Sequence, residues 1–168
     1  MTAKKNPYEL KEVVLRLAEG HSLYGDRPIQ DSSDAVWLLR KELANADREY
    51  VCLINLNMAG KPVNYNIVSV GGLDSSIFDI PNILKACMLS NCRRFVVLHN
   101  HPSGSLEPSE WDITSTRQLI AAAKLLGLAC EDHIIVGNDM RYVSLRDREY
   151  VSFTTQYRLI DTGCEPER

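Results

Sequence analysis

The sequence predicts one mixed α/β domain, built on a single β-sheet with helices packed against it. At the start of the chain, hydrophobic residues recur at helical spacing. From residue 49 on, runs of β-branched and aromatic residues typical of strands alternate with segments of helical spacing. A chain of 168 residues can bury one substantial core but is short for two domains. A hydrophobic content of 45% is ordinary for a globular protein.

Two helices are expected at the start of the chain. Apolar residues recur at i, i+3, i+4 and i+7 from Leu10, and Gly20 ends this pattern. The segment "DSSDAVWLLRKELANA" then places capping residues before Val36, Leu39 and Leu43, which are again at helical spacing. We expect residues 1–46 to form an N-terminal helical extension.

The middle of the chain predicts a hairpin, a helix and a buried strand. The segments "EYVCLINLN" and "KPVNYNIVSVGG" are typical of strands, and "NMAG" between them indicates a turn. Helical spacing returns in "DIPNILKACMLSN". The apolar run "RRFVVLHNH" predicts a buried strand that Pro102 ends.

The last elements are a helix and a second hairpin. Ser109 is the expected N-cap of the helix, and Gly127 is its C-terminal stop. The segments "LACEDHIIVG" and "MRYVSL", joined by the turn "ND", predict two paired strands. Residues 47–155 are therefore expected to form the main domain, and residues 156–168 a polar C-terminal tail.

Composition excludes several classes of protein. No stretch reaches the roughly 18–20 apolar residues of a membrane span, and the N-terminal segment lacks the apolar region of a signal peptide. The five cysteines form no C-x-x-C pair, and Cys52, Cys87 and Cys130 fall in apolar segments. We therefore expect a cytoplasmic protein without a disulfide framework or a membrane partner. The net charge of −3 does not support association with nucleic acid.

The segment "LHNHPSGSLEPSEWD", residues 98–112, is the strongest candidate site. Side chains at i and i+2 of a strand share a face with Cα atoms roughly 6.5–7 Å apart, so His99 and His101 can converge on one ion. Asn100 faces the other way. Asp112 follows in the first helical turn, where the positive end of the helix dipole favours an ionised carboxylate.

These three groups would leave a fourth ligand position open, as in catalytic zinc sites. Such a site also needs a proton acceptor. Glu107 and Glu110 are close in the sequence, and Glu49 at the start of the first strand could face the site across the sheet. Spacing alone does not choose among them.

Purely structural interpretations are also open. The S-x-x-D pattern of Ser109 and Asp112 is an ordinary capping arrangement. A histidine is more often a hydrogen-bonded core or surface residue than a metal ligand. His133 could support a metal ligand from behind, but we expect a buried strand histidine rather than a ligand. The combination of H-x-H with Pro, Ser and Asp downstream nevertheless favours a metal site.

"HNHPSG…PSEWD" resembles the metal motif of the JAMM (MPN/JAB) metalloprotease-like superfamily, H-x-H-P followed by S-x-x-D. More narrowly, residues 47–145 resemble the C-terminal domain of the bacterial RadC family, and the downstream "DHIIVG" is part of that likeness. The resemblance implies a JAB/MPN-like (cytidine deaminase-like) architecture. It also implies a zinc-dependent metallopeptidase that hydrolyses a peptide or isopeptide bond of a peptide or protein substrate.

Residue roles follow from the same resemblance. His99, His101 and Asp112 would bind Zn²⁺, Ser109 would help to stabilise the oxyanion, and Glu49 would be the general base. Ile80-Pro81-Asn82 stands where the family has Pro-Arg-Glu, which leaves the roles of that Arg and Glu without a counterpart.

Two alternative functions remain in view. The first is a DNA-repair accessory or nucleic-acid-associated protein without hydrolase activity, the role historically attached to the RadC family. The first 45 residues show no helix-hairpin-helix pattern, which argues against it. The second is a degenerate scaffold, which ranks last because no ligand of the motif is lost. The substrate and the oligomeric state cannot be predicted from the sequence.

Overall fold

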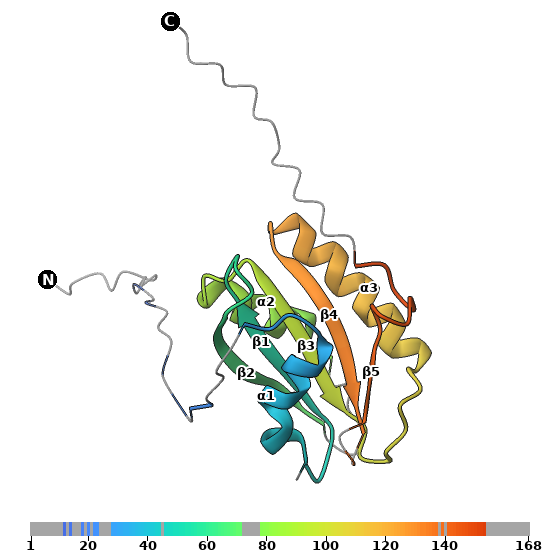
Figure 1. Ribbon diagram of the computed structural model, residues 1–168. Coiled ribbons are helices and arrows are strands. Elements are labelled where there is room, and N and C mark those ends of the chain that lie inside the picture. Colours follow the sequence, from blue (N-terminus) through green and yellow to red (C-terminus); the bar gives the residue numbers. More distant parts are fainter. Residues whose placement is uncertain are drawn as a thin grey trace, which may run out of the picture.

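The computed structural model describes residues 28–44, 46–71, 78–137 and 141–153, together with a few isolated positions. Helices lie on both faces of one sheet (Figure 1). The elements in chain order are α1 (Ser32–Ala44), β1 (Tyr50–Leu56), β2 (Pro62–Val70), α2 (Ile80–Leu89), β3 (Arg94–Asn100), α3 (Glu110–Leu125), β4 (Ala129–Val136) and β5 (Tyr142–Ser144).

The five strands form one mixed sheet in the order β2-β1-β3-β4-β5. β1 pairs antiparallel with both β2 and β3, β3 and β4 are parallel, and β5 returns antiparallel to β4. The parallel pair is joined by the crossover through α3, as parallel strands require. The predicted single mixed sheet with flanking helices is confirmed.

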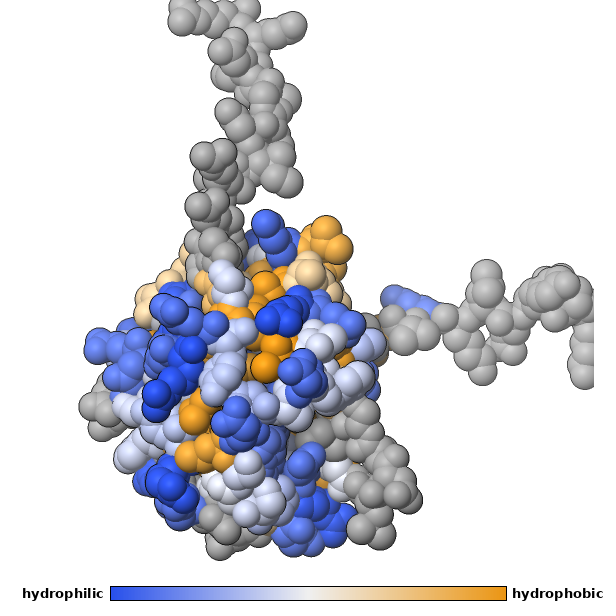
Figure 2. All heavy atoms as spheres, turned by 90° about the vertical axis from the view of Figure 1, so that its right-hand side faces the viewer, coloured by the Kyte–Doolittle hydropathy of each residue, from blue (hydrophilic) through white to orange (hydrophobic). Residues whose placement is uncertain are grey.

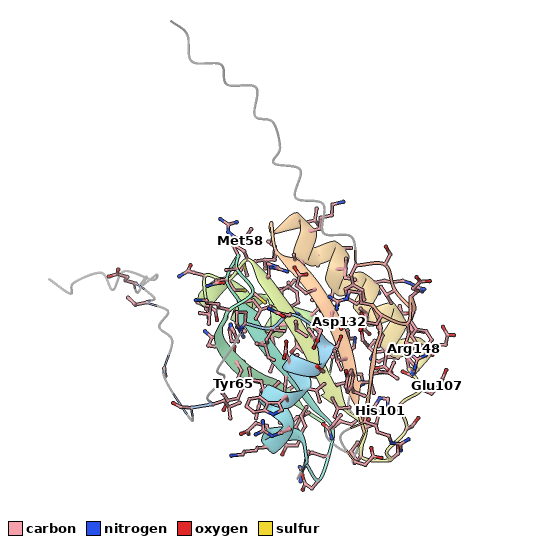
Figure 3. All side chains as sticks on the ribbon, viewed as in Figure 1. Met58, Tyr65, His101, Glu107, Asp132 and Arg148 are labelled. Atoms are coloured by element: carbon pink, nitrogen blue, oxygen red, sulfur yellow. The ribbon has the colours of Figure 1, made fainter. Side chains whose placement is uncertain are left out.

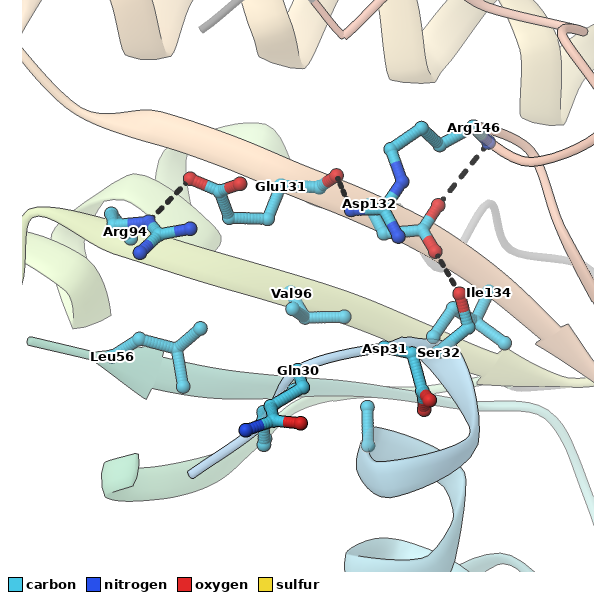
Figure 4. A pocket seen from close by; sticks show the side chains of 12 residues that line it. Gln30, Asp31, Ser32, Leu56, Arg94, Val96, Glu131, Asp132, Ile134 and Arg146 are labelled. Atoms are coloured by element: carbon cyan, nitrogen blue, oxygen red, sulfur yellow. Dashed lines mark hydrogen bonds and ion pairs between the residues drawn. The ribbon is translucent and has the colours of Figure 1, made fainter. Parts of the chain in front are cut away.

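One face of the sheet packs against α1. Leu39 and Leu43 of the helix lie in a buried cluster with Ile54 of β1 and Leu98 of β3. The hydroxyl of Ser32 also donates to Asp132 Oδ2 at 2.8 Å, which ties the start of the helix to β4 (Figure 4). Ser32 and Asp132 border a cavity of only about 40 Å³.

The opposite face is covered by α2 and α3. The strand residues of this second cluster alternate with those of the first, as the two-residue period of a strand requires. Four large members of this cluster are fully buried: Leu53, Ile83, Phe95 and Leu119. The free thiols of Cys87 and Cys130 lie in the same cluster. His99 and His133 project from this face of the sheet.

Both predicted ends of α3 are confirmed. The Ser109 side chain caps the first turn, and Gly127 follows the last turn with a φ of +67° that suits glycine. Most of the helix expected near residues 10–20 and all of the tail at 156–168 lie outside the described residues, and the four described positions of that segment, 12, 14, 18 and 20, are not helical. The domain boundaries at residues 46 and 155 stay predictions.

The surface on the side of α3 and β5 is mainly hydrophilic, and its apolar residues form small groups between hydrophilic ones (Figure 2). Within the described ranges, every helix is too short or too polar to cross a bilayer.

Candidate metal centre

His99 and His101 are placed by the end of β3. His99 is the next-to-last residue of the strand, and the backbone N–H of His101 donates to the Val136 carbonyl at 3.0 Å, beside the end of β4. The two side chains therefore leave the same face of the sheet. Their Nε2 atoms lie 2.9 Å apart.

Asp112 reaches the histidines from the first turn of α3. Its Oδ1 atom lies 3.4 Å from His99 Nε2, and its Oδ2 atom lies 3.8 Å from His101 Nε2. Oδ2 also accepts hydrogen bonds from the Ser109 backbone N–H at 2.8 Å and from its hydroxyl at 2.6 Å. The capping interpretation of S-x-x-D is thus correct, and the same carboxylate also faces the two imidazoles.

The three side chains could hold a metal ion, because one ligand atom from each lies within 4.8 Å of the others. Bonds of about 2.0–2.1 Å at tetrahedral angles separate ligand atoms by about 3.3 Å. The separations of 2.9 Å, 3.4 Å and 3.8 Å given above lie on either side of that value. The spacing of these ligand atoms therefore suits a small divalent cation.

Hydrogen bonding at His101 supports the same conclusion. Its Nδ1 lies 2.9 Å from the Ser105 carbonyl oxygen, which can only accept, so Nδ1 must carry the proton. In the neutral ring, Nε2 then presents its lone pair to His99 and Asp112. A carboxylate and a lone pair directed at one point make a favourable environment for a cation.

Burial keeps His99 in the neutral form that ligation needs. Desolvation is the main reason that the pKa of His99 is lowered from 6.5 to about 4; the Asp112 carboxylate opposes this shift, and nearby His101 adds to it. Desolvation also lowers the pKa of His133 well below its ordinary value. At neutral pH a cation therefore does not compete with a proton for the His99 ring.

The three candidate ligands lie in the wall of a cleft of about 340 Å³. His101 and Glu107 mark its position, at the end of the molecule opposite Met58 (Figure 3). The cleft is lined by Glu49, Val51, Phe78, His99, His101, Ser103, Ser105, Glu107, Ser109, Trp111 and Asp112.

Glu49 lies on the same wall as the histidines because of the strand register. Val51 of β1 pairs with His99, and Glu49 precedes Val51 by two residues, so it shares the face of His99 and lies level with His101. Its side chain is half-buried and borders the cleft. Of the three glutamates that the sequence left open, Glu107 also lines the cleft, whereas Glu110 is exposed on α3 outside the cleft lining.

Asn100, between the two histidines, points to the other side of the strand. Its Oδ1 accepts from the backbone N–H of Tyr50 at 2.8 Å, and its Nδ2 donates to the Arg48 carbonyl at 3.0 Å. These two bonds hold the backbone on either side of Glu49. The strand that carries the histidines thus fixes the position of Glu49.

Sequence reasoning gave Thr116 no role at the site and did not identify the residues that His133 contacts. His133 does lie buried in β4, but its Nε2 is 2.7 Å from His99 Nδ1. Thr116, buried on α3, contacts the other nitrogen of the same ring at 2.5 Å. The "DHIIVG" segment was the only part of the sequence that pointed to His133. The pairing of β3 with β4 is needed to show that His133 contacts His99.

The comparison with known proteins follows this geometry. The family model described as the RadC-like JAB domain matches residues 29–150. The chain belongs to the RadC family. A RadC family member with a JAB domain is expected to have a JAB/MPN-like fold, and the five-stranded mixed sheet with flanking helices is consistent with it.

Relatives of this RadC family chain occur in several organisms. It is 37% identical over 137 residues to a UPF0758 protein of Chloroflexus aggregans, covering 82% of this chain and 59% of the relative. A UPF0758 protein of Desulfitobacterium hafniense is 36% identical over 123 residues, covering 73% and 54%. One of Methanococcoides burtonii is 30% identical over 142 residues, covering 83% and 62%. The chain thus spans between half and two thirds of the length of these relatives.

Proposed function

We propose that this RadC-like protein is a zinc-dependent hydrolase of the JAMM type that cleaves a peptide or isopeptide bond. One observation carries the proposal: two imidazole nitrogens and a carboxylate converge in the wall of a cleft. Three protein ligands leave a position for solvent or substrate, as catalytic zinc sites do and structural zinc sites do not.

Each residue of the cleft wall has a role in this proposal. His99, His101 and Asp112 would hold the ion. A bound zinc ion would supply Lewis-acid activation of a water molecule and of the scissile carbonyl. Glu49 would accept a proton from the attacking water and deliver it to the leaving amine.

Ser109 would stabilise negative charge on the carbonyl oxygen. Its hydroxyl now donates to Asp112 Oδ2, while the backbone N–H of Ser109 donates to the same oxygen. The hydroxyl can therefore turn to a substrate oxygen without leaving that carboxylate oxygen unpaired.

The cleft supports a peptide or protein as the substrate. Its volume of about 340 Å³ is near the lower end of ligand sites, so it would take a short segment of a larger molecule. Trp111 is 54% exposed and borders the cleft, where its ring offers apolar contact area to such a segment.

A cytoplasmic location is part of the proposal. The four cysteines in the described ranges, Cys52, Cys87, Cys92 and Cys130, are buried free thiols, which suits a reducing compartment.

The test combines metal analysis with a cleavage screen. Purified wild-type protein should contain close to one zinc ion per chain, and Asp112→Ala should lose it. The zinc-loaded protein should cleave members of a library of peptides that contain α-linked and ε-linked lysine bonds. Protein that binds no divalent ion at these three residues would contradict the proposal.

The alternative role in DNA repair calls for a separate measurement. The net charge of −3 does not favour phosphate binding, and the metal-ligand, base and oxyanion roles proposed above already account for five residues of the cleft. A salt-dependent affinity for branched or single-stranded DNA, together with no cleavage in the screen, would favour this alternative over hydrolysis.

A further inference from the structure

A chain of hydrogen bonds runs from α3 to the metal-facing side of His99. Thr116 Oγ1 lies 2.6 Å from the Asp112 backbone carbonyl oxygen, which can only accept, so the hydroxyl donates its single proton there. The same Oγ1 lies 2.5 Å from His133 Nδ1 and must therefore accept from that nitrogen. His133 thus carries its proton on Nδ1.

The next link fixes His99. His133 is completely buried, and its ring contacts include Thr116, His99 and the Phe78 ring, with ring centroids 5.0 Å apart for the last. With its proton on Nδ1, the neutral His133 ring presents a lone pair at Nε2, 2.7 Å from His99 Nδ1. His99 Nδ1 must then be the donor, and His99 Nε2 is left without a proton.

We propose that His133 and Thr116 are positioning residues that hold His99 in the Nδ1–H tautomer, with its Nε2 lone pair directed at the metal position. The inference rests on the proposed metal site but not on hydrolysis. It gives a role to a buried strand histidine and a helix threonine that the hydrolytic mechanism does not use.

The hydrogen bond of a ligating histidine to a second group sets its tautomer and ring orientation, and loss of such a partner typically costs 10–100-fold in metal affinity. Here the partner is another histidine, which has two tautomers of its own. The Thr116 hydroxyl removes that ambiguity. Without it, His133 could protonate on Nε2 instead, and His99 would then hold its proton on the nitrogen that faces the metal.

Two substitutions at one position separate this role from packing. Thr116→Val keeps the shape of the side chain and removes the hydroxyl, whereas Thr116→Ser keeps the hydroxyl and removes a methyl group. A packing role predicts that the valine variant resembles wild type more closely. Tautomer control predicts the reverse: zinc affinity near wild type for Thr116→Ser, and a loss of about tenfold or more for Thr116→Val.

Zinc affinity is measured by competition with a chromogenic chelator, and urea unfolding of both metal-free variants controls for folding. The proposal is overturned if Thr116→Val binds zinc as tightly as Thr116→Ser.

A second measurement needs no variant and no metal. Long-range ¹H–¹⁵N spectra of the metal-free wild-type chain, which has four histidines, report the protonated nitrogen of each ring at pH 8. We expect Nδ1–H for His99 and His133. Protonation of His99 on Nε2 would overturn the inference. If wild type binds no zinc, the proposed function fails, and this spectrum alone decides the tautomer.

Discussion

Glu49 and Glu110 offer a matched comparison of single residues. Both were candidates for the general base, but only Glu49 lines the cleft, level with His101. We expect Glu49→Gln to retain the metal and to lose at least about 10²-fold in kcat, because the amide cannot accept the proton. Glu110→Gln should keep wild-type activity. Metal content and kcat of both variants are measured, and undiminished turnover by Glu49→Gln would show that the base lies elsewhere.

Ser109 combines a structural and a chemical role, which can be separated. Ser109→Ala removes the helix cap and should reduce the free energy of unfolding by about 0.5–2 kcal/mol. With the metal site saturated, it should also lower kcat by about 10²–10³-fold, the usual cost of removing one oxyanion donor. Urea unfolding and steady-state kinetics measure the two effects. Ser109→Thr keeps the hydroxyl and should preserve both, whereas loss of stability with full kcat in Ser109→Ala would leave the cap as its only role.

Among the elements, α1 tests whether the chain has a separate N-terminal extension. It was expected to belong to an N-terminal extension, but its Leu39 side chain is completely buried against the sheet. We expect Leu39→Ala to reduce the free energy of unfolding by about 2–5 kcal/mol within a single cooperative transition. The exposed Lys41 of the same helix supplies the control, and Lys41→Ala should change stability by less than about 0.5 kcal/mol.

Urea unfolding followed by circular dichroism measures this effect. A separate early transition for α1, with the rest of the protein unaffected by Leu39→Ala, would instead support the interpretation of α1 as part of an N-terminal extension.

The elements were predictable from local signals, whereas several contacts of the site were not. The Ser109 cap and the Gly127 stop depend on residues within one turn, so the sequence was sufficient to place α3. His99 and His101 share a face through the two-residue period of one strand. The link from His133 to His99 instead depends on the register of two parallel strands, which shifts between Phe95 and Val96. Pattern alone cannot supply such a register, because it arises from packing between distant segments.

Glu49 illustrates the same limit. Spacing left three glutamates open, and family resemblance rather than periodicity selected Glu49. The structure places it by pairing β1 with β3, so that Val51 lies opposite His99. The predicted role of Glu49 in proton transfer still depends on the kinetic test above.

For the whole molecule, the buried imidazoles predict how stability depends on pH. In the unfolded chain a histidine binds a proton below about 6.5, whereas burial holds the pKa of folded His99 near 4. The free energy of unfolding of the metal-free protein should therefore fall as the pH drops from 6.5 toward 4. Buried Asp132 acts in the opposite direction, because burial raises its pKa and the folded state favours its neutral form.

A difference between two proteins isolates the histidine contribution. Urea unfolding of metal-free wild type and His99→Asn at pH 7.5 and pH 5 should show a smaller decrease with acidification for the variant. Equal decreases in the two proteins would mean that His99 is not held neutral in the folded state.

The Asn100 side chain has a consequence for errors in strand pairing. A slip of β1 by one residue would turn Glu49 toward the α1 face of the sheet. The histidines would then no longer share a face with a carboxylate from β1. Such a slip would also break both bonds from Asn100 to the backbone of Arg48 and Tyr50, and it would bury the freed amide. The Asn100 side chain thus destabilises a misaligned pairing of β1 with β3, in which the proton acceptor would be separated from the ion. The same side chain therefore favours both correct strand pairing and a site that is competent for the proposed chemistry.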